Sequence, residues 1–399
     1  MQYLSADCII PVTGEPCYDS VLLVDDDGKI EGIFPKTELH KTISELQHYY
    51  GILCPGFVNT HCHLELSWAK GLIAEHTGLD NFVRQLEKIR NTVSESNTQQ
   101  SIELEAVEMG KSGIIATADI SNGPGTFGFK KTSNHYFHTF IEVFGSDPSF
   151  AELIFEKANQ LKSQFNSINP GERVSITPHA TYSLSPELFR MIANAEKGEL
   201  LSIHHQENED ENYFFENGTG RIAARRNLFN SHLQPFTGSG KRPLESISSY
   251  FSRDQKILLV HNTVSEKQDI EFARNYFNQV FWCLCPNANL YIENKLPDVN
   301  LFHSTDCKIT LGTDSLASNH QLSILDEMKT IQLHFPKITL PEMIRWGTLN
   351  GAEFLGIDEK SGSFEKGKSP GIVLIENVNT KTLKLTPEST SQLIIPAIL

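Results

Sequence analysis

Eight short apolar stretches, each followed by a segment of helical character, recur through the middle of the chain and constrain its fold most. Several are continuous runs of β-branched and other apolar residues, as is typical of strands buried on both faces of a parallel sheet. The alternation of strand and helix predicts an α/β fold. The predicted strands cover residues 56–61, 113–119, 138–144, 174–178, 200–204, 256–261, 280–285 and 308–313.

The segments between these strands carry helical periodicity and helix start signals. Leu79, Phe82, Leu86 and Ile89 recur at the spacing of one helix face within residues 79–93. Residues 185–188 begin with a serine suited to an N-cap position and continue with a proline suited to the first helical turn. Eight strand and helix units in about 290 residues fit a (β/α)8 TIM barrel better than an open sheet.

Both ends of the chain carry β-structure of a different style. Short strands are predicted at residues 8–12, 21–24 and 30–34 near the start, and at 372–375 and 393–395 near the end. Because an isolated two-stranded sheet is marginally stable, we expect the termini to meet in one small β-sandwich. The predicted division is a composite β-sandwich domain of residues 1–53 and 346–399 around a barrel domain of residues 54–345.

Charge and cysteine content restrict the partners and the compartment. The chain has 34 Lys and Arg against 49 Asp and Glu, a formal net charge of −15, which argues against binding to a nucleic acid polymer. We find no apolar run of about 20 residues that would span a membrane and no secretory signal at the start. The chain has seven cysteines, an odd number, and we expect them to be reduced thiols. We expect a cytoplasmic protein that acts on a small molecule. The sequence does not determine the oligomeric state, for which a homodimer is the candidate.

Polar residues gather at the carboxyl ends of the predicted strands, where barrel enzymes build their sites. The first strand ends in His61 and His63, whose period-2 spacing directs both imidazoles to the same side. His204, His261 and Asp314 end the fifth, sixth and eighth strands. A single such histidine is more often a hydrogen-bonded structural residue, and an aspartate before serine is more often a helix N-cap. Their joint occurrence favours a metal site.

Several motifs carry a family resemblance that extends over nearly the whole chain. The segment of residues 55–67, Pro-Gly-Phe-Val-Asn-Thr-His-Cys-His-Leu-Glu-Leu-Ser, resembles the first-strand signature of the metal-dependent amidohydrolase superfamily. The likeness continues through residues 177–186, 204–207, 259–261, 285–290 and 311–315, in the same order. Within the superfamily the chain is similar to the branch of cytosine, guanine, S-adenosylhomocysteine and aminodeoxyfutalosine deaminases and triazine hydrolases, and most like the aminodeoxyfutalosine deaminases.

The resemblance implies a metal site with one ion. Its ligands would be His61, His63, His204 and Asp314, and the ion would be divalent, with Zn²⁺ favoured over Fe²⁺. The fourth predicted strand ends in His179 rather than lysine, so a bridging carbamate with a second ion is not expected. A bound ion would lower the pKa of its water from 15.7 toward about 7, and Asp314 would accept the proton.

The resemblance also implies roles for residues around the ion, and each has a plainer alternative. Glu207 would protonate a ring nitrogen, or else belong to a solvated acidic loop with residues 209–211. His261 would hydrogen-bond the attacking hydroxide or stabilise the tetrahedral centre. Three residues are expected to contact the substrate, and each has an alternative role. Glu65 would bind a ribose hydroxyl or an amine, or else support a ligating histidine. His179 would contact substrate or product, or else cap a helix, and Trp68 would stack on a planar base, or else pack against hydrophobic neighbours.

Three functions remain open at this point. The favoured one is hydrolytic deamination of an amino-substituted heterocycle, such as an adenine-like nucleoside resembling aminodeoxyfutalosine. The same scaffold would also serve hydrolysis of a C–Cl or cyclic amide bond. A barrel that has lost catalysis and serves as an assembly subunit is the third reading, but such proteins typically lose ligands, and this chain keeps the full set.

Overall fold

The computed structural model describes residues 1–39, 46–90, 92–168 and 173–399. Eight parallel strands form its centre, in two four-stranded sheets ordered β5-β6-β7-β8 and β9-β10-β11-β12. The strands are β5 (Phe57–Cys62), β6 (Ile114–Ser121), β7 (Tyr136–Val143), β8 (Arg173–Pro178), β9 (Leu201–His205), β10 (Lys256–His261), β11 (Gln279–Leu284) and β12 (Lys308–Leu311). Each predicted barrel strand is therefore confirmed to within two residues at either end.

Backbone contacts at the carboxyl ends join the two sheets into a barrel. The His204 N–H donates to the His179 carbonyl at 2.9 Å, which links β9 to the end of β8. The N–H groups of Thr313 and Asp314 both donate to the His61 carbonyl at 3.0 Å, which links the end of β12 to β5. The α/β fold with a (β/α)8 barrel is confirmed, and the contacts that close it involve candidate site residues.

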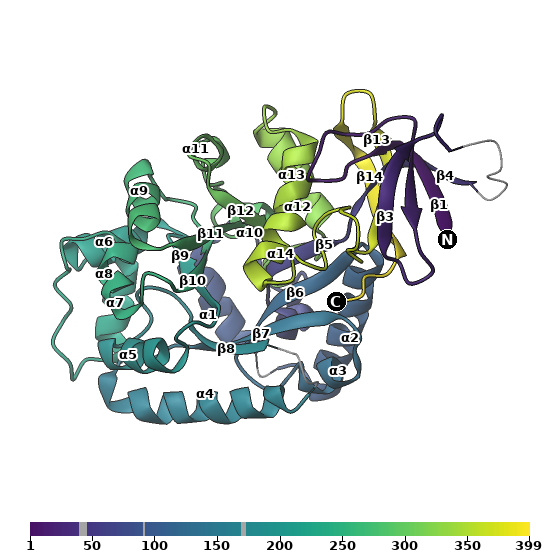
Figure 1. Ribbon diagram of the computed structural model, residues 1–399. Helices are drawn as coiled ribbons and strands as arrows, with labels where there is room; N and C mark the ends of the chain where they lie inside the picture. The colour runs from purple at the N-terminus through teal and green to yellow at the C-terminus, as the bar shows by residue number, and fades with distance from the viewer. Residues whose placement is uncertain (40–45, 91, 169–172) are drawn as a thin grey trace.

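Helices surround the barrel, with α4 along one side of the molecule (Figure 1). The Ser185 hydroxyl caps α5 as predicted, accepting from the Leu188 N–H at 3.3 Å. The α-helices are α1 (Leu79–Ile89), α2 (Glu95–Lys111), α3 (Phe127–Thr132), α4 (Ala151–Asn166), α5 (Pro186–Ala195), α6 (Glu209–Asn217), α7 (Gly220–Phe229), α8 (Pro243–Ile247), α9 (Lys267–Tyr276), α10 (Pro286–Glu293), α11 (Val299–Ser304), α12 (Ile324–His334), α13 (Leu340–Trp346) and α14 (Leu349–Leu355). Three 3-10 helices are η1 (Leu64–Ala69), η2 (Pro148–Phe150) and η3 (Ser248–Tyr250).

The two ends of the chain meet in a separate mixed sheet, as predicted. Figure 1 shows the purple amino-terminal and yellow carboxyl-terminal strands side by side. Hydrogen bonds connect all six strands in one sheet, in the order β14-β13-β4-β1-β2-β3. Its strands are β1 (Gln2–Ile9), β2 (Ser20–Val24), β3 (Ile30–Pro35), β4 (Leu46–Pro55), β13 (Ile372–Asn379) and β14 (Lys384–Ile395). The termini join where β13 pairs antiparallel with β4.

Four terminal strands differ from the prediction, and one of them, β13, extends to Asn379 instead of ending at residue 375. The strand predicted at residues 8–12 is wrong in its bounds. Strand β1 begins at Gln2 and ends at Ile9, and Val12 has φ 77°, which turns the chain out of the extended conformation. Strand β4 was not predicted because Gly51, with φ 134°, interrupts its pattern. Strand β14 is longer than residues 393–395, since an edge strand tolerates Pro387 and a polar composition.

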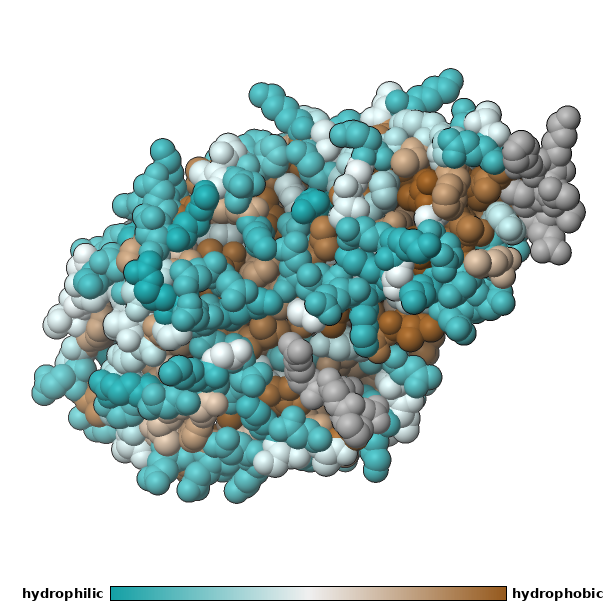
Figure 2. All heavy atoms as spheres, in the orientation of Figure 1, coloured by the Kyte–Doolittle hydropathy of each residue, from teal (hydrophilic) through white to brown (hydrophobic). Residues whose placement is uncertain are grey.

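Apolar side chains fill the barrel interior and the layer between the sheets and the helices. Val58, Phe140, Leu258 and Phe281 are among the buried residues of the inner cluster. Figure 2 shows hydrophilic side chains over most of the visible face, as the high charge content leads us to expect. Within the parts of the chain that are described, no helix has both the length and the apolar character needed to cross a bilayer.

Candidate metal centre

Three histidines from β5 and β9 converge at the carboxyl end of the barrel. His61 lies in β5, His63 follows it by two residues, and His204 lies in β9. The Nε2 atoms of His61 and His63 are 3.2 Å apart, and the ring centroids of His61 and His204 are 4.8 Å apart. One ligand atom from each of the three lies within 4.8 Å of the others. The structure thus brings together three of the four predicted ligands as a group able to hold a metal ion.

Asp314, the fourth predicted ligand, lies three residues after the end of β12 and faces the same group. Its Oδ1 is 3.7 Å from His61 Nε2 and 3.6 Å from His63 Nε2. Its Oδ2 accepts a hydrogen bond of 2.6 Å from the Ser318 hydroxyl, which leaves Oδ1 to face the histidines. Although burial raises the pKa of Asp314, the hydrogen bond with His61 and the charges of His63 and His261 lower it overall.

The spacing of these atoms fits a small divalent ion. A tetrahedral zinc ion with metal–nitrogen distances of about 2.0–2.1 Å holds neighbouring ligand atoms about 3.3 Å apart. The distances among His61 Nε2, His63 Nε2 and Asp314 Oδ1 are 3.2, 3.6 and 3.7 Å, close to that spacing. Three imidazoles and a carboxylate are also a donor set that zinc and ferrous iron accept. The residues present therefore fit the expected ion.

Burial favours, in His61 and His63, the neutral form that a metal ligand needs. Desolvation lowers the pKa of His61, and desolvation together with the nearby His61 lowers the pKa of His63 to about 4. Two nitrogens that face each other at 3.2 Å repel if both are protonated, so neutral rings are also the stable arrangement. The group is thus prepared to bind a cation at neutral pH.

Glu207 and His261 lie beside the histidine group and face each other. Glu207 Oε1 is 3.9 Å from His261 Nε2, and the His261 ring lies 5.3 Å from the His204 ring. Burial, followed by the charges of Asp314, Glu293 and Glu211, raises the pKa of Glu207 well above its usual range. Glu207 is 8% exposed, whereas the Glu209 side chain is 51% exposed and pairs with Lys295. The solvated-loop alternative therefore fits Glu209 and does not fit Glu207.

The three predicted substrate contacts lie in different surroundings. Both carboxylate oxygens of Glu65 accept from the Asn122 N–H, at 3.1 and 3.2 Å, and burial raises the Glu65 pKa to about 7. His179 is next to His204, with ring centroids 4.8 Å apart, and its Nδ1 is buried without a hydrogen-bond partner among the described residues. Trp68 packs at the edge of a hydrophobic cluster formed by η1, α1 and α10. Direct contacts of these residues with substrate stay predictions.

Sequence reasoning missed one buried carboxylate in this group. Glu142 lies in β7, 3.4 Å from His204 Nδ1, and belongs with His179 and His204 to a second cluster of potential ligands. Although burial raises the Glu142 pKa, the charges of His179, His204 and His63 lower it to about 2. The sequence contained a signal for Glu142. It lies near the end of the predicted third strand, and polar residues at the ends of other predicted strands were selected as site candidates.

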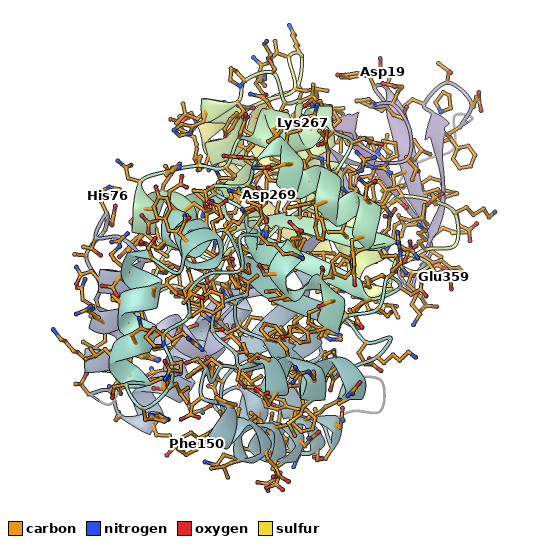
Figure 3. The ribbon with its side chains drawn as sticks, turned by 90° about the vertical axis from the view of Figure 1, so that its left-hand side faces the viewer. Asp19, His76, Phe150, Lys267, Asp269 and Glu359 are labelled. Atoms are coloured by element: carbon orange, nitrogen blue, oxygen red, sulfur yellow. The ribbon has the colours of Figure 1, made fainter. Side chains whose placement is uncertain are left out.

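Two segments outside the histidine group are held by specific contacts. In residues 66–97, of which Asn91 lies outside the described residues, the Leu79 N–H donates to the Glu293 carboxylate of α10 at 2.8 Å. His76, at the edge of the molecule in Figure 3, also donates its N–H to the Tyr291 carbonyl. Arg242, the residue before α8, pairs with Asp269 of α9 at 2.6 Å.

Sequence comparison decides the family. The profile of the Amidohydrolase family matches residues 52–393, most of the chain. The chain belongs to the Amidohydrolase family. This result agrees with the resemblance read from the strand-end motifs, and the matched region contains every candidate ligand and the whole barrel.

Individual relatives are distant but similar over most of their length. A 5-methylthioadenosine/S-adenosylhomocysteine deaminase of Saccharophagus degradans is 26% identical over 94% of this chain and 83% of its own. The structure of Helicobacter pylori aminofutalosine deaminase with methylthio-coformycin superposes with a TM-score of 0.82 at 22% identity, covering 97% of this chain and 94% of the other. A zinc-bound adenosine deaminase of Xanthomonas campestris superposes with a TM-score of 0.73 at 18% identity, covering 96% and 87%. These structural matches, at low identity, support the shared fold.

Proposed function

We propose that this amidohydrolase is a metal-dependent deaminase that releases ammonia from an adenine-like nucleoside, such as aminodeoxyfutalosine. The observation that carries the proposal is the buried Glu207 beside His261 and the three-histidine group. A deaminase needs a proton donor for the ring and an activated water in the same place, and this arrangement places residues for both. Relatives named as deaminases of adenine-like nucleosides support the substrate class.

The proposed ion is a single divalent cation held by His61, His63, His204 and Asp314, with zinc favoured. When bound, such an ion lowers the pKa of a water from 15.7 toward about 7 and so makes a nucleophile available at neutral pH. Asp314 would accept the proton of a water in this site, because each of its carboxylate oxygens keeps a lone pair besides the one that faces the histidines or accepts from Ser318. The zinc-bound state of the Xanthomonas campestris structure supports the choice of metal.

Glu207 would act as the general acid. Burial raises its pKa well above the usual range, which favours the protonated carboxyl that could donate to a ring nitrogen while water adds to the adjacent carbon. His261 would stabilise the tetrahedral centre. The Asn289 amide lies 3.4 Å from His261 Nδ1, so that nitrogen accepts and the ring proton stays on Nε2, which faces Glu207.

Substrate contacts are proposed for Glu65, His179 and Trp68. His179 is the best placed, because its unpartnered Nδ1 is close to the histidine group. Glu65 already holds the Asn122 N–H, so a contact with a ribose hydroxyl would use the remaining lone pairs of its two oxygens. Trp68 would contribute only if its ring extends beyond the cluster in which it packs.

A panel of amine and non-amine substrates tests this function. We expect the zinc-loaded protein to release ammonia from at least one of aminodeoxyfutalosine, 5′-methylthioadenosine, 5′-deoxyadenosine and adenosine. The Asp314→Asn variant should keep its fold by circular dichroism and lose turnover. Hydrolysis of a chlorotriazine or a cyclic amide, with every amine inert, would establish the alternative reaction, and absence of all turnover would favour a non-catalytic subunit.

The division of the chain and its assembly are also proposals. The composite domain would comprise residues 1–53 and 346–399 around a barrel of residues 54–345, in a cytoplasmic homodimer. Light scattering on the purified protein would measure the oligomeric state directly.

A further inference from the structure

Glu142 makes a set of contacts that the proposed reaction does not use. Its Oε2 accepts a hydrogen bond of 2.9 Å from the side-chain amide of Asn122. Its Oε1 is buried and has no hydrogen-bond partner among the described residues, although it lies 3.4 Å from His204 Nδ1. A buried carboxylate oxygen without a hydrogen bond is costly unless a nearby positive charge compensates it.

The two nitrogens of His204 have separate tasks. Its Nδ1 lies 2.8 Å from the His179 carbonyl, and a carbonyl can only accept, so Nδ1 carries the ring proton. Only Nε2 then has a lone pair for a metal ion. Since Glu142 faces the protonated Nδ1 edge, it stands behind the ligand, on the side of the ring away from the metal-binding nitrogen.

This geometry also bears on the second cluster of potential ligands. Glu142, His179 and His204 offer atoms within 4.8 Å of one another, which by itself could indicate a second ion. His204, however, has one free lone pair and belongs to the three-histidine group as well. Without it, Glu142 and His179 provide two ligands, fewer than the three protein ligands of a typical catalytic zinc site. One ion for the whole group is therefore favoured.

We propose that Glu142 is a positioning residue that orients His204 and balances the charge of the bound ion from outside the ligand set. A divalent cation held by three neutral imidazoles and Asp314 keeps one positive charge, and the Glu142 carboxylate brings the total to zero. Carboxylates behind ligating histidines fix the ring and raise its basicity, and their loss typically costs about 10–100-fold in metal affinity. The proposal rests on the one-ion site proposed above.

Zinc affinity measured with a competing chromophoric chelator tests the proposal without any substrate. We expect wild type to bind one zinc ion per chain and Glu142→Gln to bind it about 10–100-fold more weakly. Glutamine keeps the hydrogen bond from Asn122 Nδ2 through its oxygen and then turns an uncharged NH2 group toward the protonated Nδ1 edge of His204. Glu142→Asp, which keeps the charge, should lose less affinity than Glu142→Gln.

The matched control is Glu196→Gln, which alters a carboxylate that is 1% exposed and pairs with Lys162 at 2.8 Å. It should leave zinc affinity unchanged. The proposal is overturned if Glu142→Gln binds zinc as tightly as wild type or if Glu142→Gln and Glu196→Gln lose equal affinity. Two zinc ions per wild-type chain would also overturn it. Zinc binding with the expected variant effects but without deamination would instead contradict the proposed function alone, and absence of zinc binding would contradict both.

Discussion

Several non-glycine residues beside the metal centre have positive φ, a conformation that is uncommon for side-chain-bearing residues. Gln206, His261, Asn262 and Asp314 have φ values of 46°, 74°, 56° and 55°. Gln206, His261 and Asn262 directly follow or end a barrel strand, and Asp314 lies three residues after β12. Strained backbone at such positions persists when the surroundings hold it, and it often occurs at functional sites. Here it turns Glu207 and Asp314 toward the histidines as each strand ends.

Glu207 gives the sharpest test of a single side chain. We expect Glu207→Gln to lower kcat by about 100-fold or more, as loss of general acid catalysis should. The substitution keeps the shape of the side chain and removes its proton donor. Steady-state ammonia release, measured on the best substrate of the panel, gives the rate.

Glu209→Gln is the matched control for this experiment, because Glu209 belongs to the same acidic run but its side chain is half exposed and pairs with Lys295. It should turn over at nearly the wild-type rate. Near-normal turnover of Glu207→Gln would assign the general acid role to another group.

A buried ion pair between β6 and α3 supports the turn that follows the first two ligands. The Lys130 ammonium lies 2.6 Å from Asp119 Oδ2 and donates to the Thr139 hydroxyl, and neither charged side chain is exposed. Asp119 Oδ1 accepts from the Leu64 N–H at 2.8 Å, in the residue after His63. This link connects the end of the second strand to the ligand-bearing end of the first.

Removing one partner of this pair should be strongly destabilising. We expect Lys130→Met to lower the free energy of unfolding by about 3–5 kcal/mol, because it leaves Asp119 buried and uncompensated. Urea unfolding measures the change. Lys131→Met, at the exposed neighbouring position of α3, should change stability by less than about 0.5 kcal/mol. Equal stability of the two variants would show that the buried pair contributes little.

At the scale of the whole molecule, the proposed ion joins the first and last strands of the barrel. His61 in β5 and Asp314 after β12 are separated by most of the chain, yet Oδ1 of Asp314 is 3.7 Å from His61 Nε2. These ligand atoms converge only when the barrel is closed. Metal binding and folding of the barrel should therefore be coupled.

Metal removal tests this coupling. A ligand at about 100 times its Kd stabilises the folded state by about 2.7 kcal/mol if the unfolded chain does not bind it. We therefore expect chelator treatment to lower the Tm measured by calorimetry, and zinc to restore it. Identical transitions with and without metal would contradict a site that draws its ligands from both ends of the barrel.

The sequence by itself determined the parts that depend on local patterns. Apolar runs located the eight barrel strands to within two residues, because strands buried on both faces must be apolar along their length. The same strands indicated where His61, His63, His204 and Asp314 would meet, since parallel strands place their carboxyl ends at one edge. Strands β4 and β14 were not found in full, because a glycine and an edge position remove the pattern that marks a strand.

Only the tertiary structure decided which acids are buried and what they face. Glu207 and Glu209 belong to one acidic run, yet one lies beside His261 and the other is solvated. Glu142 lies behind His204 because β7, β8 and β9 are brought together when the barrel closes. Burial and charge environment depend on residues far apart in the chain, and these contacts exist only once the strands have assembled.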